Sequence, residues 1–478
     1  MPPEPLEPRR DLTLTDAAAL VVGIIIGTGI FLKAASMAQS VGTPGLVLAA
    51  WVAAGFLAML GALCFAELGA LLPHAGGEYV YLRTAYGELP GFLYACNAFV
   101  LNGAAVAAYG AAAAIFVSDI HPLGGEWLGG NAHLLGHDYH FSFGPRQLLA
   151  IGVIAVFAAI NCMGVMFGGR VQSILTVAKI VAVAGVAAGV FLFGTTGAAD
   201  NLAAPAGSSS GGLAGFGAAI FSALWAFSGW QFLPMAASEV REPQRNLPRA
   251  IVGGTLLVLA LYLAINTAYL YALPFWQVAS ANSTAYPDAP SVAARAVQTF
   301  LGGRGALVAA LIFLISTIGS LNGVILSAAR VPYAAARDGL FFAPFGRLHS
   351  SSRVPVTSLV LLAVWGSLLA ATGTFDQLTN MAVMSYALFW IPVVLAVIVL
   401  RRRLPTAPRP YRVPLYPWVP LIFALTMAWI VVSALLTTPL EATATVVLIL
   451  LGLPLYPLFR GRRRAPTASA TATPAPRA

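Results

Sequence analysis

The chain has 478 residues, of which 59% are hydrophobic and only 9% are charged. So little charge excludes a soluble globular protein and indicates a protein that crosses a membrane several times. The net charge of +9 does not predict nucleic-acid binding, because the cations alternate from loop to loop along the chain.

The distribution of lysine and arginine predicts an orientation. If the N-terminus is inside, all but five of the 26 Lys and Arg residues fall in cytoplasmic segments. Four of the five are assigned to outer loops, namely Lys33, Arg146, Arg295 and Arg304. The fifth, Lys179, lies within a span. By the positive-inside rule both termini are predicted to be cytoplasmic, and we expect the N-terminus to be retained.

Twelve apolar segments are each about 20 residues long, as a bilayer core about 30 Å thick requires. They are predicted at 16-38, 44-70, 89-118, 147-166, 171-194, 212-237, 248-272, 305-331, 354-372, 376-400, 417-436 and 441-459. The tails at 1-10 and 465-478 are rich in Pro, Ala and Thr, so we expect them to be disordered.

The first span contains the stretch GIIIGTGIF, in which Gly23, Gly27 and Gly29 are separated by Ile and Thr. Glycine and β-branched residues are unfavourable for a continuous helix. In lipid, a broken helix is tolerated where its freed N–H and C=O groups line a cavity or meet a ligand. The stretch therefore predicts a binding site, although glycines at four-residue spacing also form helix-packing faces.

The sixth span carries a second predicted break, in LWAFSGWQFLP. Ser228 and Gly229 weaken the helix there, between Trp225 on one side and Trp230 and Pro234 on the other. The aromatic side chains could close over a small ligand, and packing in the protein core is the alternative for Trp230.

The two breaks lie five spans apart, which predicts a five-helix unit that occurs twice. The second unit must be inverted in the membrane because five is odd. The first repeat is predicted at 11-195 and the second at 196-403, with two further helices in 404-464. Paired broken helices in inverted repeats indicate a substrate site near the middle of the membrane. Their free N–H and C=O groups suit an anion and a cation, and a zwitterion has both charges.

Two charged residues in the predicted spans need partners. Lys179 lies well inside the fifth span, where a lysine costs about 2.5–3.5 kcal/mol, so we expect a buried structural or proton-linked role. Glu67, near the inner end of the second span, is either a functional carboxylate or the partner of an arginine. The three cysteines, Cys64, Cys96 and Cys162, are interpreted as apolar fillers and predict no disulfide.

Two polar connections are also informative. The segment between the second and third spans predicts an amphipathic stretch on the inner membrane face, with Tyr79, Tyr81 and Tyr86 as interfacial anchors. The outer loop at 119-146 holds four histidines, namely His121, His133, His137 and His140. Their helix-like spacing makes zinc binding conceivable, but no cysteine accompanies them and we predict no metal site.

Several motifs together resemble the amino acid-polyamine-organocation superfamily. They are GIIIGTGIF, FAELGALLPHAGGEYVYL, LWAFSGWQF and SEVREPQRNLPRAIVGG. Two later stretches, GSLNGVILSAARVPYAAARDGLF and TTPLEATATVVLILLGLPLYPLF, are similar to its L-type amino acid transporter branch. The resemblance implies an all-α membrane protein with 12 transmembrane helices, in the LeuT-type arrangement with helices 1 and 6 broken. It also implies sodium-independent amino acid transport by alternating access, with neither a cofactor nor an enzymatic activity.

The resemblance also implies roles for individual residues. The main chain of Thr28, Gly29 and Ile30 is expected to bind the substrate carboxylate. The amino group is expected to bind at the main-chain carbonyls, or in the immediate surroundings, of four residues: Ile25, Trp225, Ala226 and Ser228. Trp225 is also the expected gate. Lys179 is expected to tether the first span to the eighth, where Asn322 is a candidate for the contact.

Animal L-type transporters carry a cysteine after the third span that binds a partner glycoprotein, whereas residues 119-146 contain none. We therefore expect no disulfide-linked heavy chain, and a monomer in a bacterial inner membrane. Exchange of neutral L-amino acids is the leading hypothesis, because the spans expected to face the substrate lack a carboxylate at mid-membrane. Proton-coupled symport through Lys179 is the alternative, and Trp225 could hold a cationic substrate. A membrane enzyme or a non-transporting sensor is disfavoured. We expect Gly29→Val to weaken substrate binding without unfolding the protein.

Overall fold

The computed structural model describes residues 8–134, 137–203, 211–283, 285–286 and 289–460. The first part of the chain forms α1 (Leu14–Ile25), α2 (Gly29–Val41), α3 (Pro44–Leu71), α4 (Glu78–Tyr86), α5 (Glu88–Ile120), β1 (Leu128–Leu134), β2 (His137–Phe143), α6 (Pro145–Cys162) and α7 (Val165–Phe193). The next part forms α8 (Gly212–Phe227), α9 (Phe232–Met235), α10 (Pro243–Ala272), α11 (Phe275–Ala279), α12 (Val292–Leu301), α13 (Gly305–Ala328) and α14 (Arg330–Arg337). The last part forms α15 (Val356–Thr372), α16 (Phe375–Arg403), α17 (Trp418–Thr437), α18 (Pro439–Leu450) and α19 (Tyr456–Arg460).

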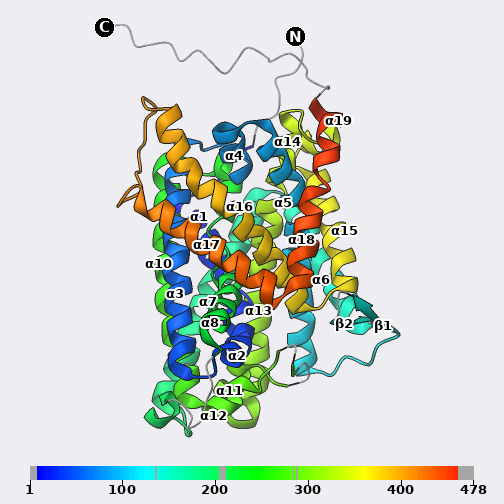
Figure 1. Ribbon diagram of the computed structural model, residues 1–478. Coiled ribbons are helices and arrows are strands. Elements are labelled where there is room, and N and C mark those ends of the chain that lie inside the picture. The colour runs from blue at the N-terminus through cyan, green and yellow to red at the C-terminus, as the bar shows by residue number, and fades with distance from the viewer. Residues whose placement is uncertain (1–7, 135–136, 204–210, 284, 287–288, 461–478) are drawn as a thin grey trace.

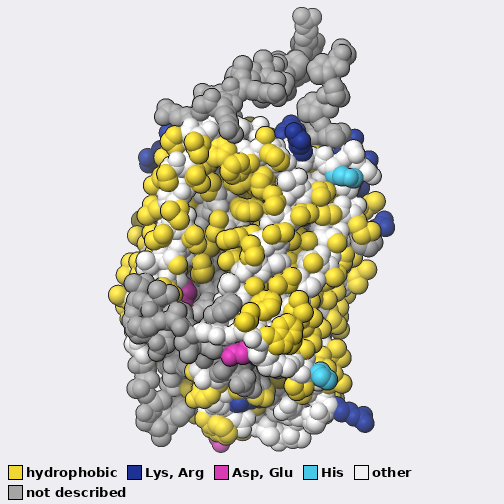
Figure 2. Space-filling view, turned by 90° about the vertical axis from the view of Figure 1, so that its right-hand side faces the viewer, with side chains coloured by type: hydrophobic (Ala, Val, Ile, Leu, Met, Phe, Trp, Pro, Cys, Tyr) yellow, Lys and Arg dark blue, Asp and Glu magenta, His cyan; other side chains and the backbone are white. Residues whose placement is uncertain are grey.

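The long helices run along the long axis of the molecule, with α4, α14 and α19 at one end and α11 and α12 at the other (Figure 1). We call these the α4 end and the α12 end. Within the residues that the structure describes, ten helical stretches are long and apolar enough to cross a membrane, and α8 and α15 are shorter apolar helices. Each of these overlaps one of the twelve predicted segments. Hydrophobic side chains cover much of the face in Figure 2, and Lys and Arg gather near the two ends. The protein is therefore a multi-pass membrane protein.

Both predicted helix breaks are present. α1 ends at Ile25 and α2 begins at Gly29. The second break separates α8, which ends at Phe227, from α9, which begins at Phe232. The intervening residues are buried, so the main-chain groups freed at each break must find partners inside the protein.

Local signals fix where the helices start. At α1, Thr13 and Asp16 form a capping box: the Asp16 N–H donates to Thr13 Oγ1, and the Thr13 N–H donates to Asp16 Oδ2. At α16, the side chain of Thr374 caps the Gln377 N–H in the same way. These caps fix the first turns of the two helices; α1 carries Gly23 further along, and Asp376 lies in the first turn of α16.

The structure corrects three expectations about the connections. α4 lies where the amphipathic segment is predicted, but Tyr79 and Tyr81 are fully buried, so they are not interfacial anchors. Tyr86 is half-buried and donates its hydroxyl to the Pro392 carbonyl at 2.8 Å. Lys33, assigned to an outer loop, is a buried residue of α2.

The outer loop also differs from expectation, because it forms an antiparallel hairpin of β1 and β2. His133 and His137 therefore lie on paired strands and do not have helical spacing. The side chains of His133, His137 and His140 lie outside the described residues, as do most of the predicted tails. Among the residues that the structure describes, no group of three or more His, Cys, Asp or Glu could hold a metal ion.

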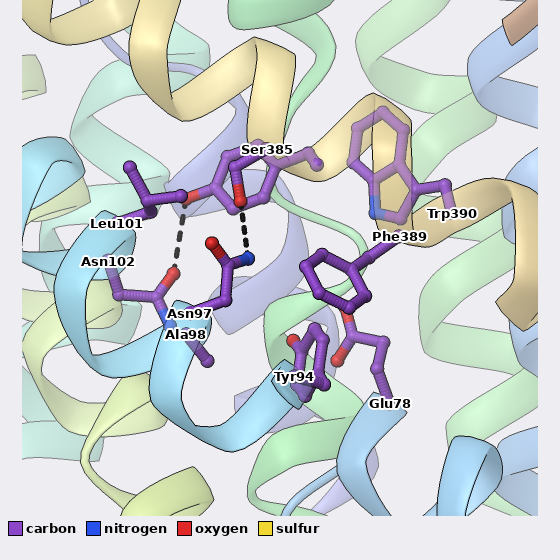
Figure 3. Close-up of a pocket in the computed structure, with 10 residues that line it drawn as sticks. Glu78, Tyr94, Asn97, Ala98, Leu101, Asn102, Ser385, Phe389 and Trp390 are labelled. Atoms are coloured by element: carbon purple, nitrogen blue, oxygen red, sulfur yellow. Dashed lines mark hydrogen bonds between the residues drawn. The ribbon is translucent and has the colours of Figure 1, made fainter. Parts of the chain in front are cut away.

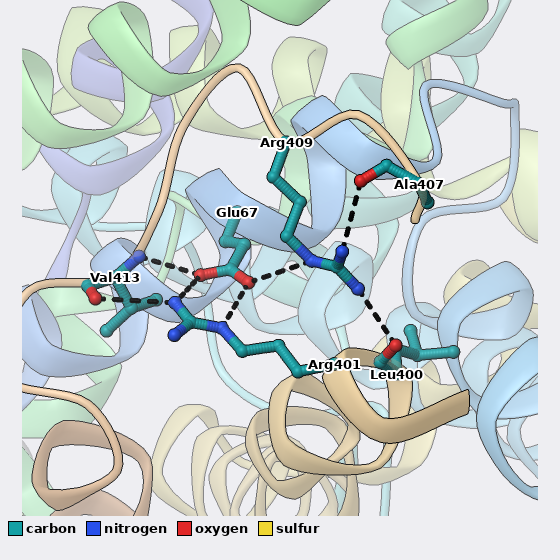
Figure 4. A network of polar contacts seen from close by, with 6 residues as sticks. All are labelled: Glu67, Leu400, Arg401, Ala407, Arg409 and Val413. Atoms are coloured by element: carbon teal, nitrogen blue, oxygen red, sulfur yellow. Dashed lines mark hydrogen bonds and ion pairs between the residues drawn. The ribbon is translucent and has the colours of Figure 1, made fainter. Parts of the chain in front are cut away.

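Glu67 is the partner of arginines at the α4 end (Figure 4). Its carboxylate accepts from Arg401 at 2.9 and 2.6 Å and from the Val413 N–H at 2.7 Å. Arg409 is 3.7 Å away, and it also donates to the Leu400 carbonyl. The network joins α3 to the end of α16 and to the chain that leads to α17.

Glu67→Gln should destabilise the protein by about 3 kcal/mol, since it leaves two arginines facing a neutral amide. The measurement is thermal unfolding of detergent-solubilised protein. Glu242→Gln is the control, because the Glu242–Arg245 pair is well exposed and should be worth less than about 1 kcal/mol. Equal unfolding temperatures for the two variants would contradict the structural importance of this network.

Candidate functional site

The last carbonyls of α1 are satisfied by side chains from neighbouring helices. A helix end leaves its final C=O groups without partners in the helix. The Lys179 ammonium, on α7, donates to the carbonyls of Gly23 at 2.5 Å and Ile26 at 2.9 Å, and to Ser320 Oγ at 3.0 Å. Its positive charge also complements the negative end of the α1 dipole. Lys179 is buried, as its position in the sequence predicts.

Two serines of α13 contact the same helix end. Ser316 Oγ donates to the Ile26 carbonyl at 2.9 Å. Ser320 Oγ lies 3.0 Å from the Gly23 carbonyl and 3.2 Å from those of Ile24 and Ile26, so its single proton is shared among them. α13 is thus linked to the first break directly and through Lys179.

Asn322 does not make the contact proposed for it. Its amide donates to Gln172 Oε1 at 3.1 Å and to the Gly168 carbonyl at 3.2 Å, and it accepts from Asn161 at 2.8 Å. It therefore links α13 to α6 and α7. Ser320, two residues earlier, faces Lys179 instead, because two residues correspond to about 200° around a helix.

Tyr262 of α10 connects the two breaks, and the sequence analysis missed it. Its hydroxyl is 2.6 Å from the Ile25 carbonyl and 3.1 Å from the Ala226 carbonyl. Ile25 ends α1, and Ala226 lies in the last turn of α8. The available signal was a phenol in the middle of a predicted span, since a phenol needs a hydrogen-bond partner when it is buried.

Trp225 lies across the beginning of α2. Its indole Nε1 donates to Thr28 Oγ1 at 3.0 Å, and its ring centre is 5.2 Å from that of Tyr109. The edge of a further ring, Phe375 of α16, is directed at it with the centroids 6.4 Å apart. The first N–H groups of a helix have no partner within it, and at α2 these belong to Thr28, Gly29 and Ile30.

The glycines of the two breaks allow the two main chains to touch. A Cβ on Gly29 would lie 2.5 Å from Ala226 Cα, and a Cβ on Gly229 would lie 2.6 Å from the Ile25 nitrogen. Contacts this short cannot form without moving backbone. Gly29 therefore has a packing role as well as its expected binding role, and Gly29→Val should destabilise the protein as well as weaken binding.

Polar side-chain atoms at the second break have open hydrogen-bonding capacity. In the part of the chain that the structure describes, Ser228 Oγ and Gln231 Nε2 are buried without a hydrogen-bond partner. The other amide atom of Gln231 accepts from the Gly229 N–H at 2.8 Å. Buried polar atoms are usually paired, so these atoms mark a place for a polar ligand or water.

An ion pair joins α2 to α16. Lys33 Nζ lies 2.6 Å from Asp376 Oδ1 and donates to Thr379 Oγ1 at 2.9 Å, which joins α2 to α16. The same ammonium is 5.0 Å from the centre of the Phe375 ring, which contacts Trp225. The Phe375 ring therefore contacts both the Lys33–Asp376 ion pair and the Trp225 indole.

A second set of contacts closes the site toward the α4 end. Glu239, in the short turn η2 (Ala237–Glu239) after α9, forms a buried ion pair with Arg330 of α14 at 2.9 Å. The Leu12 N–H donates to the Glu239 carbonyl at 3.0 Å, and the Arg241 N–H donates to the Leu12 carbonyl at 2.8 Å. The segment before α1 is thus joined to the segment after the second break.

This arrangement of two facing helix breaks occurs in a chain whose residues 12–453 match the sequence profile of a family described as amino acid permease. The chain belongs to the amino acid permease family. The superfamily predicted from the motifs is therefore confirmed.

Individual permeases and transporters match over most of their length. The serine/threonine exchanger SteT of Bacillus subtilis (strain 168) is 31% identical over 454 residues, which cover 94% of this chain and 96% of SteT. The b(0,+)-type amino acid transporter 1 of Mus musculus is 29% identical, with 94% of this chain and 88% of the relative covered. The large neutral amino acids transporter small subunit 2 of Homo sapiens is 28% identical, with 94% and 80% covered.

Gly29→Ala should lower the thermal stability of this permease, because even one methyl group collides with the Ala226 main chain. We expect a cost of about 1–3 kcal/mol, as for other overpacked cores. Gly253→Ala is the matched control, since no atom lies within 4 Å of a Cβ placed there. Thermal unfolding in detergent measures both; a Gly29 variant as stable as the Gly253 variant would contradict the close packing of the breaks.

Proposed function

We propose that this protein exchanges neutral L-amino acids by alternating access, without sodium. The observation that carries the proposal is the pair of facing helix breaks, which offers open N–H donors at the start of α2 and convergent carbonyls at the ends of α1 and α8. The permease family and the amino acid substrates named for its relatives agree with it.

The α2 donors suit the carboxylate group of the substrate. The N–H groups of Thr28, Gly29 and Ile30 stand at the positive end of the α2 dipole, where anions bind. The side chain of Thr28 is held by Trp225, so the indole can cover a substrate that lies against these donors. We therefore assign Trp225 as the gate.

The carbonyls of Ile25 and Ala226 suit the amino group. Both accept from the Tyr262 hydroxyl, and each carbonyl oxygen has a second lone pair that can accept from a substrate ammonium. An ammonium group has three donors and can use both acceptors at once. Ser228, two residues after Ala226, adds a buried hydroxyl that has no partner among the described residues. A zwitterionic amino acid matches both halves of the site.

Two features favour exchange of neutral substrates over the alternatives. The three N–H groups of the Lys179 ammonium meet three acceptors, which favours a fixed tether over a group that releases its proton in each cycle. The charge on this ammonium lies beside the first break and would repel a cationic side chain. Because the family is one of permeases, neither an enzyme nor a non-transporting sensor is proposed.

We further propose the LeuT-type arrangement of two inverted repeats, 11-195 and 196-403, followed by two helices in 404-464. Its support is the spacing of the two breaks and their reciprocal glycine contacts. In alternating access, the Lys33–Asp376 contact and the Glu239–Arg330 contact would open in turn. We also propose that the α4 end and both termini lie in the cytoplasm, and the positions of Lys and Arg support this orientation by the positive-inside rule.

The protein is proposed to work as a monomer in a bacterial inner membrane, without a disulfide-linked heavy chain. The cysteines support this proposal because all three are free and lie on helices, Cys64 on α3, Cys96 on α5 and Cys162 on α6. No cysteine occurs between residues 119 and 146.

The test is uptake of labelled amino acids by purified protein in liposomes, with and without unlabelled amino acid inside. We expect uptake of neutral L-amino acids that requires internal substrate, in buffers without sodium. Accumulation in empty liposomes that follows an imposed pH gradient would replace exchange by proton-coupled symport. The absence of any amino acid uptake under all these conditions would reject transport.

Thr28→Val should weaken apparent substrate affinity about 2- to 10-fold, because it removes the acceptor of the Trp225 indole at a cost of about 0.5–1.5 kcal/mol. Thr28→Ser keeps the hydroxyl and should stay near the wild-type value. The measurement is the KM of exchange for both variants. Equal KM values would show that the Trp225–Thr28 bond does not hold the gate over the substrate.

A further inference from the structure

A small polar cavity lies between α4, α5 and α16. Figure 3 shows the carboxyl group of Glu78 directed into it together with side chains of α5 and α16. Its polar lining comes from Glu78, Tyr94, Asn97, Asn102, Ser385 and Tyr386. Its volume of about 10 Å³ is close to the space that one water molecule needs. Glu78 is 1% exposed, so the carboxyl group is shielded from bulk solvent.

Three polar atoms around this cavity have unused hydrogen-bonding capacity. Among the described residues, Glu78 Oε2, Asn97 Oδ1 and Asn102 Nδ2 are buried without a partner. The remaining amide atoms are engaged, since Asn97 donates to Ser385 Oγ at 2.6 Å and Asn102 accepts from Tyr386 at 3.2 Å. When Glu78 carries its proton on Oε2, the open groups are two donors, Glu78 Oε2 and Asn102 Nδ2, and one acceptor, Asn97 Oδ1. A water molecule matches them because it can accept twice and donate once. A metal cation would be repelled by the amide donor.

The groups that face Glu78 do not neutralise a charge on it. Tyr94 of α5 shares a hydrogen bond with the carboxyl group, and the other titratable neighbours are Tyr81 of α4 and Tyr386 of α16. The charged residues further along α4 and beyond α14 are paired, because Arg83 and Tyr79 both donate to Asp338. Burial therefore raises the pKa of Glu78 to about 8, despite the opposing hydrogen bonds from its own N–H and from Tyr94.

The residues before Glu78 contact the second break. The Gly76 N–H donates to the Met235 carbonyl, at the end of α9, at 2.9 Å. A Cβ on Gly77 would lie 3.0 Å from the Met235 nitrogen. Both glycines have positive φ, of 107° and 51°, a conformation that other residues rarely adopt. A shift of the start of α4 would thus be transmitted to α9.

We propose that Glu78 and the adjoining cavity form a proton-binding site with one bound water molecule, and that release of this proton loosens α4 from α5 and α16. The uncompensated carboxylate would draw water into the cavity, since an unpaired buried charge is unfavourable. Through Gly76 and Gly77 the change reaches α9 and the second break. The consequence for the exchange rate rests on the proposed transport function, whereas the proton site does not.

The first test is the thermal stability of the purified protein between pH 6 and 9. A carboxyl group whose native pKa is raised to about 8 binds its proton more tightly in the folded protein than in the unfolded one. Its stabilising contribution is therefore lost as pH rises toward 8. We expect the wild type to lose stability over this range relative to Glu78→Gln, which keeps the neutral form. Glu242→Gln, at an exposed carboxylate, should follow the wild type.

A second variant addresses the site without altering the carboxyl group. Tyr94→Phe removes a hydrogen bond that favours the ionised form of Glu78, so the pH transition should move to higher pH. Infrared difference spectra of the titrated protein should show a carboxylic acid C=O band that disappears near pH 8 and is absent in Glu78→Gln. If Glu78→Gln does not fold, the shift of the pH transition in Tyr94→Phe is sufficient to test the proton site.

The proton site is overturned if Glu78→Gln has the wild-type pH profile, or if Tyr94→Phe leaves the transition unmoved. A stabilisation that depends on sodium and not on pH would replace the proton by a metal cation and also overturn it. In liposomes with equal pH on both sides, the exchange rate should change between pH 7 and 9 in the wild type and stay level in Glu78→Gln. A protein that titrates as expected but transports no amino acid would reject the proposed function and keep the proton site.

Discussion

A helix that ends inside a membrane must find partners for its last carbonyls, and this constraint shapes the centre of the protein. Four consecutive carbonyls at the end of α1, from Gly23 to Ile26, accept hydrogen bonds from side chains of α7, α10 and α13. Lipid offers no donors, so each unpaired carbonyl would cost several kcal/mol. The three helices are thereby fixed around the break, and a single lysine, Lys179, meets two of the carbonyls. The break and its surroundings form one structural unit.

The same constraint explains why the candidate site consists largely of main-chain atoms. Glycine at 29 and 229 brings each break against the backbone of the other, and Tyr262 bridges the two helix ends. In the proposed binding mode, these main-chain groups meet the carboxylate and ammonium that all α-amino acids share. This is consistent with relatives that are named for serine and threonine in one case and for large neutral amino acids in another, at about 30% identity to this chain. Selectivity among side chains must then arise from residues around this shared core.

The sequence was informative wherever local chemistry decides the outcome. Glycine and serine in apolar spans predict the two breaks, and the cost of an isolated cation predicts the burial of Lys179. The partners were harder to predict, because they depend on the rotation of helices that are distant in the sequence. Ser320 and Asn322 are both polar residues of α13, and only their directions tell which one meets Lys179. The role of Tyr262 was hard to predict for the same reason, because it depends on how α10 packs against both breaks.

The buried charged residues fall into two groups, according to whether the groups around them compensate their charge. Among the described residues, Lys33, Glu67, Glu239 and Arg330 are paired with opposite charges, and Lys179 meets three oxygen acceptors. Glu78 has neither an opposite charge nor a full set of hydrogen bonds, although it is equally buried. Burial without an opposite charge favours the protonated form of such a carboxyl group, whereas in an ion pair the attraction between the two charges offsets part of the cost of burying them. The ion pairs therefore join helices, and the proposed proton site at the start of α4 differs from them because it has no opposite charge.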